Sequence, residues 1–233
     1  MTRSTVAMAL MADMARRQRT GIIWLSVGTV TLWGVILAVL LKLDMEPSSV
    51  LQGMRWVPPY FILFMGVAVA VMYTPVYVAH GITRRTIRNV ATGFGLSAAI
   101  GMAVVVSVLF TAEAALYDVL GLTQFSTGID RSVGVGAFAV LDLAVMYSVY
   151  FMFGWAIALA YYRLGPRWGT AVLVPSLLAL TLADAWQWRA PFLYDVLPVL
   201  DQEWMGSLLM AGLCALGWWG GSRLSGPVPL RAK

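Results

Sequence analysis

The chain has 233 residues, of which 60% are hydrophobic and only 12% are charged, and its formal net charge is +5. A soluble domain carries roughly 25% charged residues, so this composition excludes an ordinary water-soluble fold, and the high hydrophobic content excludes intrinsic disorder. Sixteen Lys and Arg residues in so apolar a chain are better explained by membrane topology than by nucleic-acid binding. The single cysteine, Cys214, excludes an internal disulfide, and with a single histidine we expect no metal site.

Six apolar stretches are long enough to cross a membrane, which takes roughly 20 mostly apolar residues. None of them alternates apolar and polar residues as the strands of an outer-membrane barrel do. The sequence therefore predicts an all-α, polytopic membrane protein with six transmembrane helices. The stretches are Gly21–Leu41, Pro59–Ala79, Val90–Leu116, Val133–Tyr162, Gly169–Trp188 and Trp204–Gly221.

The basic residues predict the orientation of these helices. The N-terminal segment, the second and fourth connections and the C-terminal tail together hold 12 of the 16 Lys and Arg residues. By the positive-inside rule, that side faces the cytoplasm. Six crossings return the chain to its starting side, so both termini are expected to be cytoplasmic. We expect residues 1–20 to form a cytoplasmic segment, residues 21–222 the transmembrane domain and residues 223–233 a cytoplasmic tail.

The N-terminal segment has apolar residues at helical spacing, namely Val6, Leu10 and Met14, followed by three arginines. This pattern predicts an amphipathic helix lying in the cytoplasmic interface, with its cations near anionic lipid. The alternative is a plain basic anchor before the first span. At the other face, the connection 184–203 is too apolar for a free loop, and it predicts short helices packed at the outer interface between spans five and six.

The connection after the second span, residues 80–89, contains three arginines and no acid. Thr83 is suited to cap a short helix beginning at Arg84. Its composition alone fits either arginines that bind lipid phosphates or a docking element for a cytoplasmic partner.

Within the spans, Asp142 is the carboxylate placed deepest. Because a carboxylate in the bilayer is costly, we expect Asp142 to face protein or water, with a hydroxyl such as that of Tyr147 as a hydrogen-bond partner. It is either a polar point on a translocation path or subunit interface, or a satisfied helix contact. Intramembrane aspartyl chemistry would need a second carboxylate, such as Asp184, beside it. The chain has no P-loop and no serine-hydrolase elbow.

The stretch His80-Gly81-Ile82-Thr83-Arg84-Arg85-Thr86 resembles the Asn-Gly-Val-Ser/Thr-Arg-Arg/Lys-Thr-like pattern found after the second span of bacterial type-2 ABC exporter permeases. The predicted layout is similar as well: a basic amphipathic start, six spans, cytoplasmic termini and a structured outer segment before the last span. His80 departs from the more usual Asn.

The resemblance implies that the chain is one permease of a homo- or heterodimer in the bacterial inner membrane, with the translocation path between the two chains. ATP and Mg²⁺ would bind a separate P-loop ATPase, so this chain is not expected to be an enzyme. The implied coupling helix, which docks on that ATPase, consists of Gly81, Ile82, Thr83, Arg84, Arg85, Thr86 and Ile87. Two other functions stay open: an ATPase-independent secondary transporter or channel, and an integral membrane enzyme.

Overall fold

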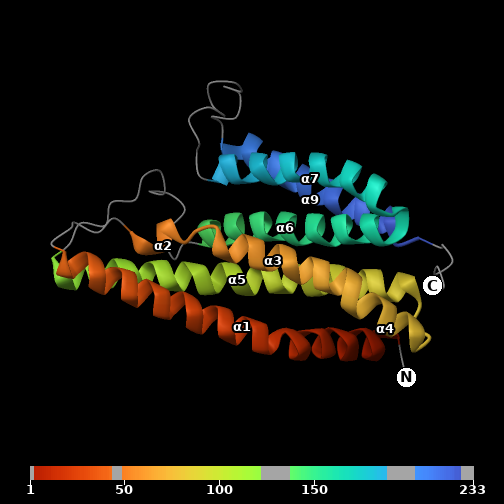
Figure 1. The fold of residues 1–233 in the computed structure, drawn as a ribbon, viewed down its shortest axis with the longest axis horizontal. Helices are drawn as coiled ribbons and strands as arrows, with labels where there is room; N and C mark the ends of the chain where they lie inside the picture. Colours follow the sequence, from red (N-terminus) through yellow and green to blue (C-terminus); the bar gives the residue numbers. More distant parts are fainter. Residues whose placement is uncertain (1–2, 44–48, 122–136, 188–202, 227–233) are drawn as a thin grey trace.

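A computed structural model describes residues 3–43, 49–121, 137–187 and 203–226. In these residues the chain is helical throughout, and long helices run back and forth along one axis (Figure 1). The long segments are α1 (Arg3–Lys42), the continuous run α3–η1–α4 (Val57–Ala68, Val69–Tyr73 and Thr74–Ala79), α5 (Arg84–Leu120), α6 (Ala137–Leu164), α7 (Pro166–Gln187) and α9 (Glu203–Leu224). A short helix, α2 (Val50–Gly53), follows α1.

The described part of each of the six predicted spans falls on one of these long segments. Five of them are long and apolar enough to cross a membrane: Thr5–Lys42, Val57–Ala79, Arg84–Leu120, Val140–Leu164 and Pro166–Ala185. The chain is therefore suited to a multi-pass membrane location. A sixth crossing by α9 and the cytoplasmic position of the termini remain predictions, although the start of α1 and the end of α9 lie at the same end of the bundle (Figure 1). The predicted outer helices of residues 188–202 lie outside the described residues.

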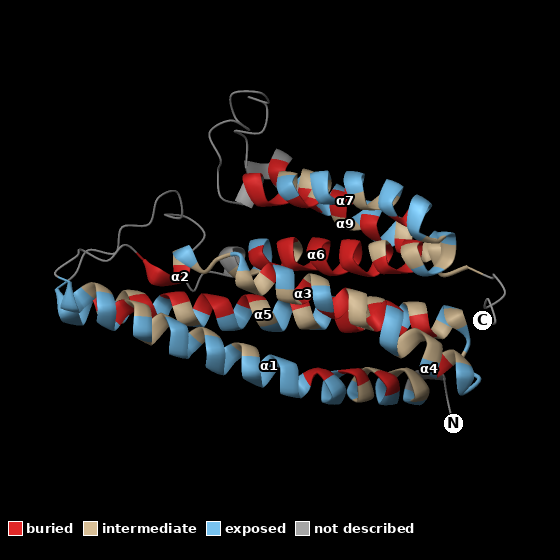
Figure 2. Cartoon of the chain, viewed as in Figure 1, coloured by how far each residue is buried: buried red, intermediate tan, exposed pale blue. Residues whose placement is uncertain are grey.

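Helix α6 is the centre of the bundle. Within its apolar stretch 94% of the residues are buried, and it packs against α3, α5, α7 and α9 (Figure 2). Glycines allow the closest of these contacts. A Cβ added at Gly66 of α3 would collide with the backbone of Phe151, and one at Gly154 of α6 would collide with the backbone of Leu63. Because both glycines lack a side chain, α3 and α6 can touch backbone to backbone.

The second span contains a local irregularity. Residues Val69–Tyr73 form a π-helical turn directly before Pro75. Proline has no backbone N–H, so the normal helical bond from residue 75 cannot form and the turn upstream widens. The Thr74 hydroxyl donates to the carbonyl of Val69 at 2.8 Å. The proline thus distorts the helix without ending it.

The N-terminal segment differs from its prediction. It does not form a separate helix in the interface, because α1 runs without interruption from Arg3 to Lys42, a length of about 60 Å at 1.5 Å per residue. The predicted apolar face is real, since Leu10 and Met14 are buried against the bundle. The contacts that hold this segment are described below.

Candidate functional site

The turn between α4 and α5 holds the residues that were expected to form a coupling helix. Gly81 adopts a φ of 78°, which an L-residue with a side chain rarely tolerates. The Thr83 side chain then accepts a hydrogen bond from the backbone N–H of Thr86, so the predicted cap is confirmed. The helix that it caps is not short, however, but the 37-residue α5. Of the seven expected residues, Gly81 to Thr83 thus belong to the loop that connects α4 with α5, and Arg84 to Ile87 form the first turn of α5.

Two arginines at this end of the bundle hold the C-terminus of α9. The Arg84 guanidinium donates to the carbonyl of Gly226 at 3.1 Å. Arg163, at the end of α6, donates to the carbonyls of Arg223 and Leu224 at 2.7 and 2.9 Å. The last carbonyls of a helix have no partner within the helix, and basic side chains satisfy them here.

The remaining residues of this turn differ in how accessible they are. Arg85 is exposed at the end of the bundle, and Ile82 is half-buried against the core. Ile87 is 3% exposed and belongs to the hydrophobic core, so it is not accessible to another protein. Of the expected coupling residues, Arg85 therefore offers the accessible charge and Ile82 the accessible apolar contact.

The N-terminal half of α1 packs mainly on α5 and reaches the second span at two points. The Tyr77 hydroxyl, near the end of that span, donates to Oδ2 of Asp13 at 2.8 Å. Near its start, the Phe61 ring is 3.9 Å from where a Cβ on Gly21 would lie. The span Val57–Ala79 has 23 residues, about 34 Å, which a bilayer core of roughly 30 Å uses almost completely. Asp13 and Gly21 of α1 thus each lie near a side chain of this segment.

Contacts with α5 extend further along α1. The methyl group of Met11 is 3.3 Å from where a Cβ on Gly93 would lie, and Trp33 donates to Glu113 at 3.0 Å. Residues 11–33 therefore run beside residues 93–113, which belong to the predicted span Val90–Leu116. That α1 enters the membrane at Gly21 stays a prediction, since helix contacts alone do not fix where a bilayer begins.

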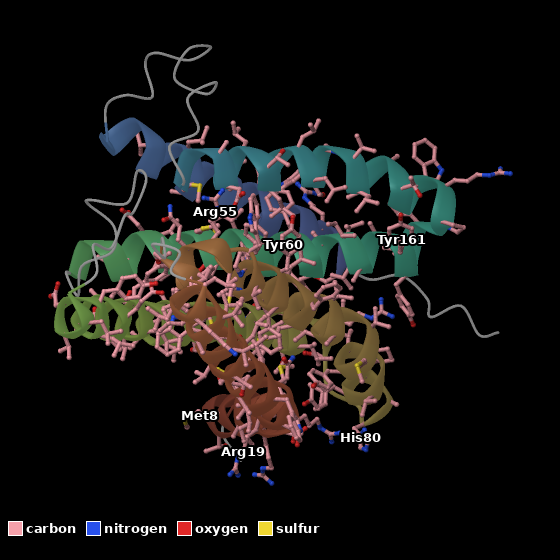
Figure 3. The ribbon with its side chains drawn as sticks, turned by 60° about the vertical axis from the view of Figure 1, so that its left-hand side comes forward. Met8, Arg19, Arg55, Tyr60, His80 and Tyr161 are labelled. Atoms are coloured by element: carbon pink, nitrogen blue, oxygen red, sulfur yellow. The ribbon has the colours of Figure 1, made fainter. Side chains whose placement is uncertain are left out.

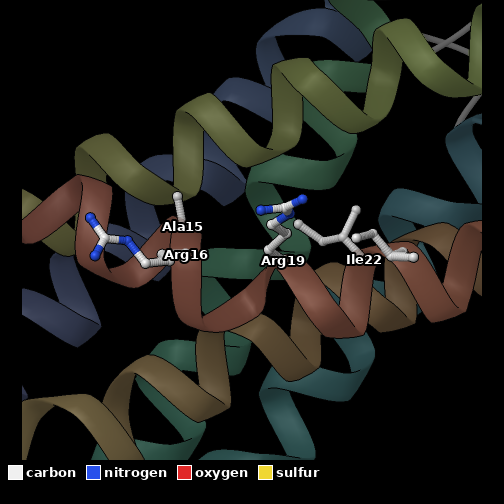
Figure 4. A pocket seen from close by; sticks show the side chains of 5 residues that line it. Ala15, Arg16, Arg19 and Ile22 are labelled. Carbon is white, nitrogen blue, oxygen red and sulfur yellow. The ribbon is translucent and has the colours of Figure 1, made fainter.

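Three arginines of α1 lie within this stretch. Arg17 forms an ion pair with Asp13 at 2.8 Å. Arg16 and Arg19 are exposed, and Arg19 lies on the outer side of α1 (Figure 3). The two side chains leave α1 in different directions (Figure 4). An arginine at the centre of a membrane-crossing helix costs roughly 2.5–3.5 kcal/mol, so such residues normally face protein or water.

The two residues expected on a translocation path lie on different faces of α6. Asp142 is exposed on the surface of this chain, whereas Tyr147 is 2% exposed. Tyr147 lines a cavity of about 40 Å³ together with Thr29, Arg55 and Phe110. The structure thus places Asp142 where a second chain, water or lipid would meet it.

A buried carboxyl group that was not singled out from the sequence lies at the far end of α5. Glu113 is 1% exposed and accepts three hydrogen bonds. Trp33 Nε1 and the backbone N–H of Leu51 donate to Oε1 at 3.0 and 3.1 Å, and the Ser49 hydroxyl donates to Oε2 at 2.5 Å. Glu113 thereby joins α5 to α1 and α2. The only sequence signal was an acid near the end of an apolar run.

A second buried carboxyl group, Asp184, accepts a hydrogen bond from the Tyr150 hydroxyl. Asp184 is 5% exposed and Tyr150 is 1% exposed. The Tyr150 ring packs edge to face on Tyr60 of α3, with 5.7 Å between ring centroids. The acid of α7 that was considered for aspartyl chemistry is therefore buried among tyrosines, while Asp142 is exposed.

Among the residues that the structure describes, no group of three or more His, Cys, Asp or Glu side chains is suited to hold a metal ion. Comparison with protein-family models, with curated proteins and with solved structures found no match.

Proposed function

We propose that the chain is the membrane permease subunit of an ATP-driven bacterial exporter, paired with a second permease chain and served by a separate P-loop ATPase in the inner membrane. The observation that carries this proposal is the turn after the second span. It combines the resemblance of residues 80–86 to type-2 ABC exporter permeases with a tight glycine turn, a capped helix start and an exposed arginine at the basic end of the bundle.

Helix α5 supplies a mechanical link for such a function. It is continuous from Arg84 to Leu120, about 55 Å. Its first turn would contact the ATPase. Near its other end, Glu113 is hydrogen-bonded to α1 and α2. When ATP brings two ATPase subunits together, a displacement of the first turn would move this far end as well. The helix would thus transmit the ATPase movement to the outer side of the path.

The structure also changes which residues should dock. Arg84 is engaged with Gly226, and Ile87 is buried, so we assign the contact to Arg85 and Ile82. A single exposed ion pair contributes only about 0–1 kcal/mol, and interface energy concentrates in a few buried contacts. The apolar Ile82 should therefore matter at least as much as the charge.

The test is the double variant Ile82→Asp with Arg85→Glu, compared with Arg167→Glu, which reverses an exposed charge in the first turn of α7 at the same end of the bundle. We expect the double variant to insert normally but to lose ATPase co-purification, or to uncouple ATP hydrolysis from transport. The control should keep both properties. Unchanged association and coupling in the double variant would defeat the proposal.

The alternative of an ATPase-independent secondary transporter is favoured by one observation, the buried pair of Asp184 and Tyr150. A buried acid within a span is typical of proton-coupled transport. Transport into proteoliposomes that follows a pH gradient, needs no ATP and is abolished by Asp184→Asn would establish this alternative.

A further inference from the structure

The cavity beside Tyr147 lies where four parts of the chain meet. Thr29 belongs to α1, Arg55 to the turn between α2 and α3, Phe110 to α5 and Tyr147 to α6. The cavity has a volume of about 40 Å³. A cavity needs roughly 10–15 Å³ to hold a water molecule, whereas sites for drug-sized ligands have roughly 300–1,000 Å³. This space therefore accommodates water and is too small for an organic substrate.

The Tyr147 hydroxyl has no hydrogen-bond partner among the residues that the structure describes, although Tyr147 is only 2% exposed. Two other deeply buried tyrosines differ from it. Tyr150 donates to Asp184. Tyr117 is hydrogen-bonded to the backbone of Val50. Because a buried tyrosine hydroxyl usually has a partner, the Tyr147 hydroxyl calls for one that is not a group of the protein.

Three polar groups line the cavity. The Ser107 hydroxyl on α5 also lacks a partner, but it is fully enclosed by protein atoms. The Tyr147 hydroxyl is not enclosed in this way, and the free space beside Tyr147 is the cavity. The Thr29 hydroxyl of α1 also has no hydrogen-bond partner in the described part of the chain. Arg55 adds a guanidinium group, which carries five N–H donors.

We propose that this cavity binds an ordered water molecule, which joins α1 to α6 through hydrogen bonds with Thr29, Arg55 and Tyr147. A buried water typically makes about three hydrogen bonds to groups that are otherwise unsatisfied, and the three polar groups here come from three different parts of the chain. Since α1 packs mainly on α5, the water supplies a link from α1 to the central helix. The proposal rests on burial and hydrogen bonding and is independent of the permease function.

The first experiment is radiolytic labelling of the full chain in phosphatidylcholine nanodiscs. An X-ray pulse produces hydroxyl radicals from bound water, so a buried side chain beside a bound water is oxidised. We expect Tyr147 to be oxidised several-fold more than Tyr117, which is 0% exposed and hydrogen-bonded to protein. After dilution into H₂¹⁸O, the ¹⁸O label should appear later at Tyr147 than at Tyr162, which is 51% exposed, because bound water exchanges more slowly than solvent.

The second experiment uses the sign of a stability change in the same nanodiscs. With a water bound, Tyr147→Phe removes a hydrogen bond and should lower the melting temperature. In a cavity without water, the same change removes an unsatisfied buried hydroxyl and raises the melting temperature instead. Thr29→Val should also lower it, and the double variant should lose less than the sum of the two, because both residues bind one water. Thr29→Ser keeps the hydroxyl and is the matched control for Thr29→Val.

Three results would overturn the proposal. Equal labelling of Tyr147 and Tyr117, or a melting temperature raised by Tyr147→Phe, would mean that the cavity is dry or filled by a lipid chain. Strictly additive losses for Tyr147→Phe and Thr29→Val would mean that no shared water joins α1 to α6. A wild-type melting temperature that is higher in chloride than in gluconate of equal ionic strength, with no such difference in Tyr147→Phe, would assign the cavity to an anion.

Discussion

Replacing Glu113 should show how far one buried carboxyl group holds the outer end of the bundle together. Glu113→Ala leaves three donors without an acceptor: the Trp33 indole, the Ser49 hydroxyl and the Leu51 amide. An unsatisfied buried donor costs about 1–3 kcal/mol. Since Trp33 is only partly buried, we expect a total loss of about 3–5 kcal/mol rather than the full sum.

Glu113→Gln is the matched control, because the bonds from Trp33 and Leu51 both end on Oε1. The amide oxygen of glutamine can keep these two bonds, while its NH₂ group donates to the Ser49 hydroxyl. We expect a loss of only about 1 kcal/mol, the usual net value of one hydrogen bond. The assay is unfolding of the purified protein in mixed micelles. Equal losses for the two variants, or a stable Glu113→Ala protein, would refute the assigned hydrogen bonds.

Three further predictions follow from packing, exposure and topology. Gly66→Ala and Gly154→Ala should each lower the unfolding free energy by about 1–3 kcal/mol, because the added methyl group meets the backbone of the neighbouring helix. At Gly101 nothing lies within 4 Å of an added Cβ, so Gly101→Ala should be neutral or stabilise by up to about 1 kcal/mol in the same unfolding assay. Asp142→Asn should change transport measured in proteoliposomes if the carboxylate lies on a translocation path, and unfolding of the same variant separates this effect from a loss of stability. A thiol introduced by Ser225→Cys should react with an impermeant reagent in inverted vesicles but not in intact cells, and labelling from outside would contradict a cytoplasmic C-terminus.

The positions of the helices could be predicted because they depend on local composition. An apolar run of about 20 residues predicts a crossing helix wherever it occurs, and each predicted run lies on a long helical segment. The Thr83 cap was predictable for the same reason, since its partner Thr86 is three residues away. The length of the helix that Thr83 caps was not predicted, because a short helix was expected and the structure has the 37-residue α5.

Contacts between helices could not be predicted from one sequence. The partners of Glu113 lie 62 to 80 residues away, and no local pattern connects them. The burial of Asp184 and the exposure of Asp142 depend in the same way on which face of α7 and α6 meets a neighbour. Both are acids in apolar surroundings, and a hydropathy pattern treats them alike.

The placement of α1 is a further contact between helices that the hydropathy pattern did not reveal. Hydropathy places residues 21–41 in the bilayer, but the contacts of Asp13 and Met11 set residues 11–33 beside the second and third spans. At the other end, α1 and α5 extend beyond α6 (Figure 1) and leave apolar residues such as Val35 and Val39 about half exposed. Apolar side chains on a membrane helix are suited to contact with lipid, so the exposure of Val35 and Val39 agrees with the hydropathy of residues 21–41.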